Sequence, residues 1–456
     1  MTSETALPPE PRTISFHVLA DLEPARRAAL LERAETDLSA YLEKVDPIIE
    51  AVRSEGDVAL SRFAKAFDKS PVEPDAIAAT RADFDTAFAA LDARMIEVLE
   101  FAVDNVRRFH QAQMPEEMWM KEMHPGVFAG DKTMPIDSVA CYVPRGKGSF
   151  PSVVMMTAIP AVVAGVPDAI IVTPPGPDGR IDDATLVAAR LAGIERVYKC
   201  GGAQAVAAVA YGTATVPRVL KIVGPGSPWV VAAKRRLADR LDPGTPAGPS
   251  ECIVLADDTA NGRVCALDLL IEAEHGSDSS AYLVTASREV AEAARAAIPD
   301  FWNEMGEQRV AFSSDVLCGP RGGIVLAETM DEAIGFVNDY APEHLEIQAA
   351  DPYQYLGRIR NAGEILMGEH TPVSIGNFVL GPNAVLPTNA AARTHSPLSV
   401  FDYMKRISLG YVTKTGYDKL APYAHDFARY EGFDAHANAL STMRTAAFAS
   451  GKRRVP

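Results

Sequence analysis

Runs of apolar residues in the middle of the chain alternate between two lengths and two periods. Short runs such as VACYV (139–143) and AIIVTPP (169–175) have the length and the β-branched content of buried strands. Longer segments such as ATLVAARLAG (184–193) repeat apolar residues at helical spacing. Strand and helix follow each other at intervals of about 25 to 30 residues, which is typical of βα units on a parallel sheet covered on both faces.

The same alternation occurs a second time after the segment GTPAGPS (244–250). Further strands are predicted at ECIVLADD (251–258), SAYLVTAS (280–287) and GGIVLAE (322–328), with helices at 260–275, 288–298 and 330–342. The sequence therefore predicts an α/β protein with two α/β units that meet near 244–250. The chain from about 24 to 122 has mostly helical periodicity, and the polar region after about 398 predicts a helical tail.

Composition narrows the classes of partner. The 456 residues carry a formal net charge of −16 and no basic block beyond KRR (452–454), so we expect no nucleic acid partner, because phosphate binding needs clustered Lys and Arg. The longest apolar stretch, 152–166, is too short to span a bilayer and contains Pro160, so no membrane partner is expected. The first residues lack the basic and apolar regions of a signal peptide, and we expect 1–23 to be a disordered leader.

Five cysteines, an odd number without a CxxC pair, indicate reduced thiols in a cytoplasmic protein. Any metal site must then use His with carboxylate or amide ligands. The segment EAEHGSDSS (272–280) offers such a pair, because Glu272 and His275 are three positions apart and would share one face of a helix. The two side chains can hold a divalent metal ion or form a solvated pair near a helix end, and the residues alone leave both open.

Two glycine turns follow predicted strands and open predicted helices, GGAQ (201–204) and GPGSPW (224–229). Such turns can admit a pyrophosphate against the backbone amides of a helix N-terminus. Neither segment has the complete GxGxxG fingerprint, so by themselves they favour plain turn geometry over nucleotide binding.

Three more segments carry candidate chemistry. In NDYAPEHLEI, Glu343 lies beside His344, and an adjacent acid and imidazole suit proton transfer near neutral pH. EGFDAH offers Glu431 and His436, and 370–388 is a long loop rich in Gly, Pro and Asn. A loop-capping histidine, a solvated tail helix and a rigid connector explain each segment taken singly. Only their occurrence together in one chain points to a functional site.

Five segments, in this order and at these separations, resemble the histidinol dehydrogenase family: GPSECIVLADD, EAEHGSDS, NDYAPEHL, GPNAVLPT and EGFDAH. The resemblance extends from about residue 25 to 445 and is carried by long, specific segments. It implies a zinc-dependent, NAD-linked enzyme that oxidises an amino alcohol to an amino acid, by two hydride transfers through an aldehyde held in the site. It also implies a homodimer in which the C-terminal tail of one subunit completes the site of the other.

The resemblance also implies an organisation of the chain. The two α/β units would be two Rossmann-like domains. The first would comprise 24–141, with the N-terminal helices, together with 250–398, and the second would comprise 142–249. Residues 399–456 would be the helical tail that is exchanged in the dimer.

Carried over residue by residue, the family pattern gives this chain four groups of site residues. His344 matches the general base for the alcohol and Glu343 the group that activates water for the second oxidation. The zinc ligands would include His275 and His436, the substrate contacts Ser250 and Glu431, and the dinucleotide contacts Tyr142 and Gln204.

Four positions depart from the family pattern. Glu272 and Asn377 stand where the family has the metal ligands Gln and Asp, Ser227 replaces an Asn that contacts the dinucleotide, and Ala384 replaces a His of the substrate pocket. Glu272 adds a carboxylate where the family has Gln, and Asn377 removes one where the family has Asp. The charge of the ligand set is therefore unchanged, and we predict that metal binding survives. The alternative is that Glu272 turns outward, which would fit a metal-free binding or regulatory protein. Loss of an imidazole at 384 makes a small polar alcohol other than L-histidinol a plausible substrate.

Overall fold

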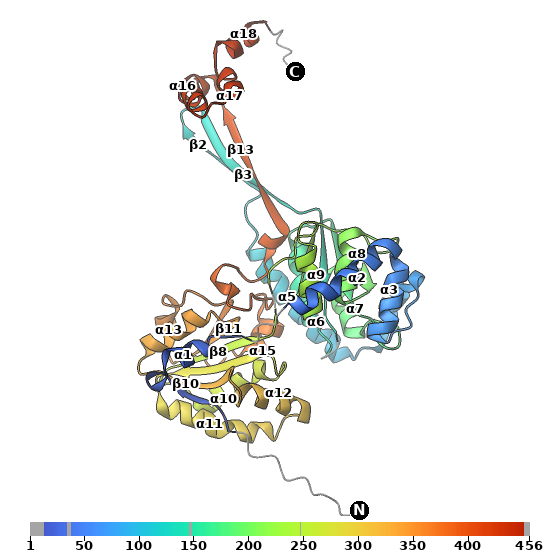
Figure 1. Cartoon of the computed structure of the whole chain (residues 1–456), viewed down its shortest axis with the longest axis vertical. Coiled ribbons are helices and arrows are strands. Elements are labelled where there is room, and N and C mark those ends of the chain that lie inside the picture. Colours follow the sequence, from blue (N-terminus) through green and yellow to red (C-terminus); the bar gives the residue numbers. More distant parts are fainter. Residues whose placement is uncertain (1–12, 34–37, 146–147, 247, 451–456) are drawn as a thin grey trace, which may run out of the picture. The chain divides into compact units, whose positions relative to one another are not determined.

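The computed structural model (Figure 1) describes residues 13–33, 38–145, 148–246 and 248–450. Its larger sheet has six strands, and every neighbouring pair is parallel. In spatial order the strands are β1 (Phe16–Val18), β10 (Gly322–Leu326), β9 (Ser280–Thr285), β8 (Glu251–Ala256), β11 (His344–Gln348) and β12 (Glu364–Met367).

Helices cover both faces of this sheet. α10 (Gly262–Ala273), α11 (Arg288–Trp302) and α12 (Glu307–Leu317) pack on one face, and α13 (Met330–Tyr340) packs on the other (Figure 1). Along β8, Cys252 and Val254 belong to the first core, whereas Ile253 and Leu255 belong to the second. A strand that is buried on both faces needs a continuous apolar run, and this is why the periodicity of the sequence revealed it.

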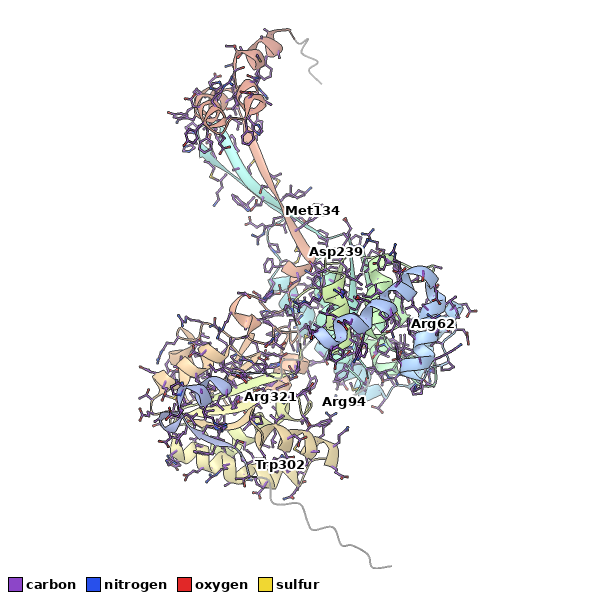
Figure 2. All side chains as sticks on the ribbon, in the orientation of Figure 1. Arg62, Arg94, Met134, Asp239, Trp302 and Arg321 are labelled. Carbon is purple, nitrogen blue, oxygen red and sulfur yellow. The ribbon has the colours of Figure 1, made fainter. Side chains whose placement is uncertain are left out.

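The indole of Trp302, labelled in Figure 2, fastens the end of α11 to α12. Its Nε1 donates a hydrogen bond of 2.9 Å to Oγ of Ser313. The N–H group of this partly buried indole is thus hydrogen-bonded, as polar groups removed from water generally are.

The smaller sheet has four parallel strands in the order β6 (Val197–Lys199), β5 (Asp168–Thr173), β4 (Ser138–Tyr142) and β7 (Lys221–Val223). Its helices are α6 (Pro151–Val163), α7 (Asp183–Ala192), α8 (Gly202–Tyr211) and α9 (Pro228–Arg236). The predicted fold class, α/β with two parallel-sheet units, is confirmed.

The N-terminal helices pack on the four-stranded sheet. The family resemblance had instead predicted that they belong to the domain of 250–398, which contains the six-stranded sheet. α2 (Ser39–Glu55) contacts α8 and α9, α4 (Arg81–Ala90) contacts α7, and α5 (Ala93–Ala112) contacts α6 and α7. α2 buries Val45, Ile49 and Val52 in one core with Val206 and Val230. Strand β4, including Cys141 and Tyr142, also lies wholly within this sheet. Helical periodicity reveals which face is buried but not the element that buries it.

The predicted leader is partly structured. Residues 1–12 lie outside the described residues, but Phe16–Val18 form β1, with Phe16 opposite Ile324 of β10. α1 (Pro24–Ala29) follows. Three residues are too few for a periodic pattern, so this edge strand could not be recognised from the sequence.

A second compact unit comprises 115–135 and 404–456, and it is described here by itself. It contains an antiparallel sheet of β13 (Met404–Val412), β3 (Val127–Pro135) and β2 (Met118–His124), followed by α16 (Lys414–Tyr430), α17 (Asp434–Asn438) and α18 (Thr442–Ser450). The regions predicted as helical, 24–122 and the tail after about 398, thus also contain parts of the strands β2 and β13. Their residues are mostly exposed on a long antiparallel ladder, so they show little hydrophobic periodicity. Among the described residues no helix is long and apolar enough to cross a membrane.

One buried acid pair links α10 to β11. Asp268 accepts a hydrogen bond of 2.6 Å from Nε2 of Gln348, and Glu346 lies beside it with its Oε1 accepting from the backbone N of Val373 at 2.5 Å. Burial raises the pKa of Asp268 to about 6, and burial together with Asp268 raises the pKa of Glu346 well above its usual range. Two adjacent buried carboxyl groups share one proton, because the low-dielectric surroundings disfavour two negative charges side by side.

The pair makes stability depend on pH. Because the pKa of Asp268 is raised in the folded state, its contribution to stability is full below pH 3.8 and is lost as pH rises through about 6. We expect Asp268→Asn to remove this dependence, so that the difference in unfolding free energy between variant and wild type changes by on the order of 2 kcal/mol between pH 4 and 7 in favour of the variant. Urea unfolding in the presence of EDTA measures it, with the exposed Asp351→Asn as control. An equal difference at both pH values would contradict the assignment.

Candidate active site

The predicted acid and imidazole pair lies at the amino-terminal edge of the six-stranded sheet. His344 is the first residue of β11, and the parallel register places it opposite Cys252 of β8 and Glu364 of β12. Glu343 directly precedes it, and Glu251 is the first residue of β8. Parallel strands start at the same edge, so the topology gathers these side chains although the sequence separates them by up to a hundred residues or so.

His344 is held by a carboxylate that the sequence analysis missed. Its Nδ1 lies 2.5 Å from Oε1 of Glu364, and its Nε2 lies 3.7 Å from Oε1 of Glu343. With Glu364 accepting from Nδ1–H, the Nε2 atom is left to exchange a proton with another group. Only the strand register brings Glu364 to this place, and nothing in the local sequence GEIL signals it.

The charges around His344 are mutually dependent. Burial alone lowers the pKa of His344, but the carboxylates of Glu272, Glu343 and Glu364 together raise it to about 10. Burial raises the pKa of Glu343 to about 8, against the opposing effect of His344. Oε2 of Glu343 accepts a hydrogen bond of 2.9 Å from the backbone N of Glu251, which fixes the carboxyl group in place.

The carboxylate of Glu251 is the second residue that sequence reasoning missed. It accepts a hydrogen bond of 2.6 Å from the backbone N of Asn389 and pairs with Nε of Arg33 at 3.3 Å. The guanidinium of Arg33 also stacks 3.5 Å from the ring centre of Tyr340. Glu251 therefore connects the start of β8 with the loop after residue 388 and supports Glu343 through its own backbone.

Three of the four predicted metal ligands come together. Glu272, in the last turn of α10, is 1% exposed, and its Oε2 lies 3.1 Å from Nδ1 of His275. Asn377, on the π-helical turn η4 (Gly376–Leu380), donates from Nδ2 to Oε1 of Glu272 at 3.2 Å. Glu272 thus points inward, contrary to the alternative in which it turns away.

These side chains fit a divalent cation. Oδ1 of Asn377 is buried without a hydrogen-bond partner in the described part of the chain, and a carboxylate, an imidazole and an amide oxygen form a donor set that zinc accepts. No group of three or more His, Cys, Asp or Glu suitable for a metal occurs among the described residues, so the set depends on the amide. α10 and α13 both end at this edge, and helix C-termini favour positive charge.

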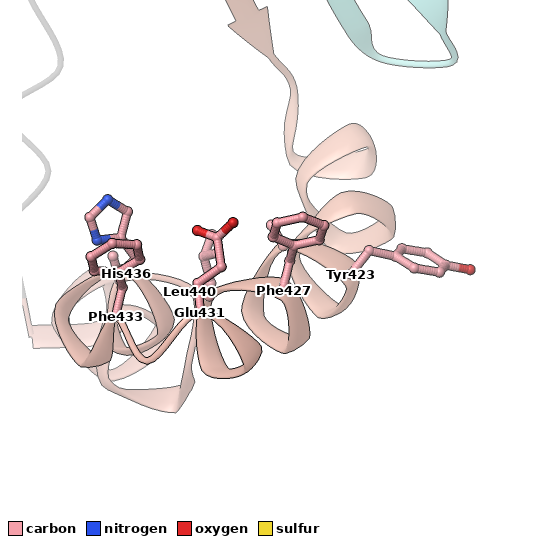
Figure 3. A pocket seen from close by; sticks show the side chains of 9 residues that line it. Tyr423, Phe427, Glu431, Phe433, His436 and Leu440 are labelled. Atoms are coloured by element: carbon pink, nitrogen blue, oxygen red, sulfur yellow. The ribbon is translucent and has the colours of Figure 1, made fainter.

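Glu431 and His436 belong to the second unit, where both line a pocket with a volume of about 590 Å³ (Figure 3). Glu431 directly follows α16 and His436 lies on α17, 5.1 Å between ring centres from Phe433. All residues that line this pocket come from the second unit. The structure therefore groups these two predicted residues with each other.

The predicted dinucleotide residues lie at the carboxyl-terminal edge of the four-stranded sheet. Tyr142 ends β4, and its hydroxyl accepts a hydrogen bond of 3.0 Å from the backbone N of Gly202 at the start of α8. Gln204, in the first turn of α8, and Ser227, the N-cap residue of α9, both line a pocket of about 380 Å³. Gly224 (φ 107°) is required there, since a Cβ atom would lie 2.2 Å from the carbonyl oxygen of Tyr142.

Ala384 lies half-buried in a loop that its neighbours hold. Nδ2 of Asn383 donates to the carbonyl oxygen of Met156 at 2.6 Å and lies 3.3 Å from Nε2 of His110. Oγ1 of Thr388 accepts from the backbone N of Gly248 at 2.7 Å, which ties this loop to the segment of Ser250. Ser250 and Ala384, two of the three predicted substrate residues, thus lie on segments that a hydrogen bond connects.

Comparisons with known proteins all point to one family. The family model "Histidinol dehydrogenase" matches residues 31–444. The chain is 60% identical to a histidinol dehydrogenase homolog of Colwellia psychrerythraea, with 96% of this chain and 99% of that protein covered, and 44% identical to the histidinol dehydrogenase of Synechocystis, with 92% and 97% covered. The crystal structure of histidinol dehydrogenase from Elizabethkingia anophelis superposes with a TM-score of 0.90 at 30% identity, covering 96% of this chain and 99% of that one.

The exchanged ligand pair can be tested by reversing it. We expect Glu272→Gln to weaken Zn²⁺ binding at least about tenfold, because the donor set loses its only carboxylate. The double variant Glu272→Gln/Asn377→Asp restores that charge and should regain most of the affinity, a coupling that a double-mutant cycle measures by competition with a chromogenic chelator. The exposed Glu369→Gln serves as control. Additive effects of the two changes would rule out a common metal site.

Proposed function

The chain belongs to the histidinol dehydrogenase family, and from this premise we propose that it is a zinc-dependent, NAD-linked alcohol dehydrogenase. It would oxidise L-histidinol or a similar small polar alcohol to the acid through a bound aldehyde, in two hydride transfers. The observation that carries the proposal is the cluster at the amino-terminal edge of the six-stranded sheet, where a supported imidazole, a carboxyl group and three metal-binding side chains meet.

The chain's own groups cover the proton transfers. With a cation offsetting the carboxylates that raise its pKa, His344 would be neutral and would accept the hydroxyl proton at Nε2, while Glu364 holds the ring through Nδ1. Glu343, fixed by the backbone of Glu251, accepts a proton from the water that adds in the second step. The adjacency of the two groups at 3.7 Å lets each stabilise the charge that the other gains or loses.

Glu272, His275 and Asn377, together with His436 of a second copy, would hold the zinc ion. When bound, zinc supplies a fixed positive charge and a template for the polar groups of the substrate. Asn377 would present Oδ1, the buried oxygen that lacks a partner in the described part of the chain. The charge of a dication also offsets the carboxylates that surround His344.

Gln204, Ser227 and Tyr142 would position NAD, which accepts the hydride. The helices α8 and α9 both begin at the 380 Å³ pocket, and their backbone N–H groups suit a pyrophosphate. Tyr142 is buried and acts through its hydrogen bond to Gly202, so it shapes the turn on which the cofactor would lie.

A homodimer with shared active sites is part of the proposal. Glu431 and His436 would reach the site of a second copy, with Glu431 contacting substrate. The second unit exposes many large apolar side chains, among them Phe427, Tyr430 and Phe448, as a surface that another subunit covers would. Five cysteines, an odd number without a CxxC pair, favour the cytoplasm as the compartment.

The substrate is where this chain would differ from the family pattern. With Ala384 in place of a histidine, the pocket lacks one polar partner, which favours a hydroxy acid, another amino alcohol or a sulfonate alcohol over L-histidinol. Four relatives that share 60 to 62% identity bear the name histidinol dehydrogenase homolog, whereas four relatives named histidinol dehydrogenase share 38 to 44%. A metal-free binding protein is the competing hypothesis, and the inward Glu272 beside His275 disfavours it.

Replacing the base and the water-activating group should affect different steps. We expect His344→Ala to lower kcat for the alcohol by about 100-fold or more without changing zinc content, because proton transfer loses its acceptor. Glu343→Gln should slow aldehyde oxidation more than alcohol oxidation. Stopped-flow NADH formation from alcohol and from aldehyde separates the steps, with the exposed His370→Ala as control. Wild-type turnover in His344→Ala would refute the base, and equal losses in both steps would refute the role of Glu343.

A substrate panel tests the consequence of Ala384. We expect wild-type protein to reduce NAD faster with a hydroxy-acid, amino or sulfonate alcohol than with L-histidinol. Ala384→His should raise kcat/KM for L-histidinol relative to that best substrate, by about tenfold for one restored polar contact. If L-histidinol is the best substrate of the wild-type protein, the expected change of preference is wrong. If the purified protein contains no zinc and shows no activity after zinc is added, the binding-protein hypothesis is favoured.

A further inference from the structure

One carboxylate lines the pocket in the four-stranded unit. Asp68 is the last residue of the π-helical turn η2 (Ala64–Asp68), and it is the only charged residue among those that line this pocket of about 380 Å³. Its Oδ2 is buried and has no hydrogen-bond partner within the described residues. A carboxylate that serves only the fold normally shows the partners that hold it, so the lack of one calls for another explanation.

The surroundings of Asp68 divide the pocket into three kinds of surface. The aromatic side chains of Phe67 and Trp229 line the pocket and are 56% and 37% exposed, so they offer apolar ring surface to a flat ligand. The helix N-termini at Gly202 and Ser227 carry partial positive charge. Asp68 adds a negative charge. Aromatic, positive and negative surfaces match the base, the pyrophosphate and the ribose hydroxyls of an adenosine diphosphate group.

The carboxylate is ionised where the protein works. Burial raises the pKa of Asp68 to about 6, with Arg145 acting in the opposite direction, so the group is an anion at neutral pH. Its charge is felt by Tyr142 and Cys200, whose pKa values it helps to raise above their usual ranges. Among the described residues Oδ2 of Asp68 makes no hydrogen bond to Arg145 or to any other group, so this oxygen can accept one from a ligand.

We propose that Asp68 favours NAD over NADP, by accepting hydrogen bonds from the ribose hydroxyls of the adenosine and repelling a 2′-phosphate. The proposal rests on the proposed dinucleotide function of this pocket. A carboxylate offers two acceptor oxygens to a vicinal diol, which offers two donors, so the groups are complementary. A phosphate at the same place would bring like charges together with little water between them.

Binding rather than turnover provides the test. Calorimetry of the full-length zinc-loaded protein with ADP-ribose and with its 2′-phosphorylated form measures the adenosine half alone. We expect wild type to prefer ADP-ribose, and Asp68→Asn, which keeps size and polarity, to lose about tenfold in affinity for ADP-ribose while gaining affinity for the 2′-phosphate form. Asp75→Asn, an exposed carboxylate of the same unit, should change neither.

Each other outcome overturns the assignment. Equal losses for both ligands in Asp68→Asn would mean that Asp68 only supports the fold, and no change in either would mean that it lies outside the site. Wild-type protein that binds neither ligand would refute the pocket itself. Because turnover is not needed, the two proposals fail separately: an Asp68-dependent preference in a protein that oxidises no alcohol refutes the enzyme function alone, whereas NAD-linked oxidation with an unselective Asp68 refutes only this assignment.

Discussion

Buried negative charge at the amino-terminal edge of the six-stranded sheet is the constraint on which the rest of the site depends. Glu251, Glu272, Glu343 and Glu364 all act on His344 or are acted on by it, and all four side chains are almost inaccessible to solvent. Among the described residues, Arg33 and the imidazoles of His275 and His344 offset them. Burying ionised groups without compensation is costly, so protons or a cation must make up the balance. The raised pKa values of Glu343 and His344 express this demand in the chain by itself.

The two parallel sheets carry their candidate sites at opposite edges. In open α/β sheets ligands usually bind at the carboxyl ends of the strands, where helices begin. The four-stranded sheet follows this rule, and its pocket lies where α8 and α9 start. The cluster of the six-stranded sheet lies where α10 and α13 end. Helix dipoles explain the difference, because one edge attracts anions such as a pyrophosphate and the other attracts cations.

The sequence predicted those parts of the structure whose signal is local. Buried strands such as β8 and β9 are continuous apolar runs, and the turns before α8 and α9 carry glycines, so both features were recognisable. The pairing of α2 with α8 could not be predicted, because an apolar stripe on a helix does not indicate which element it packs against. Strand β13 was taken for a helix because its residues are mostly exposed.

The candidate site divides in the same way. Glu272, His275, Glu343 and His344 stand in recognisable segments, and the structure brings them to one edge. Glu364 and Arg33 reach that edge only through strand register and long-range packing, so a single sequence cannot reveal them. Asn377 was identified by its departure from the family pattern, and its contact with Glu272 gives that paired exchange a geometric basis.

The loop around Ala384 has a consequence for how such proteins diverge. Asn383 anchors its backbone to Met156, Asn105 anchors the preceding turn through the carbonyl oxygen of Val379, and Thr388 closes the far end against Gly248. The anchors are side chains other than the one at 384, and none of them depends on it. A new side chain can therefore enter the pocket while the turn that carries Asn377 stays where it is. With the proposed roles of Ala384 and Asn377, specificity and metal binding would be mechanically separable, so that substrate preference could evolve by single steps without passing through an inactive protein.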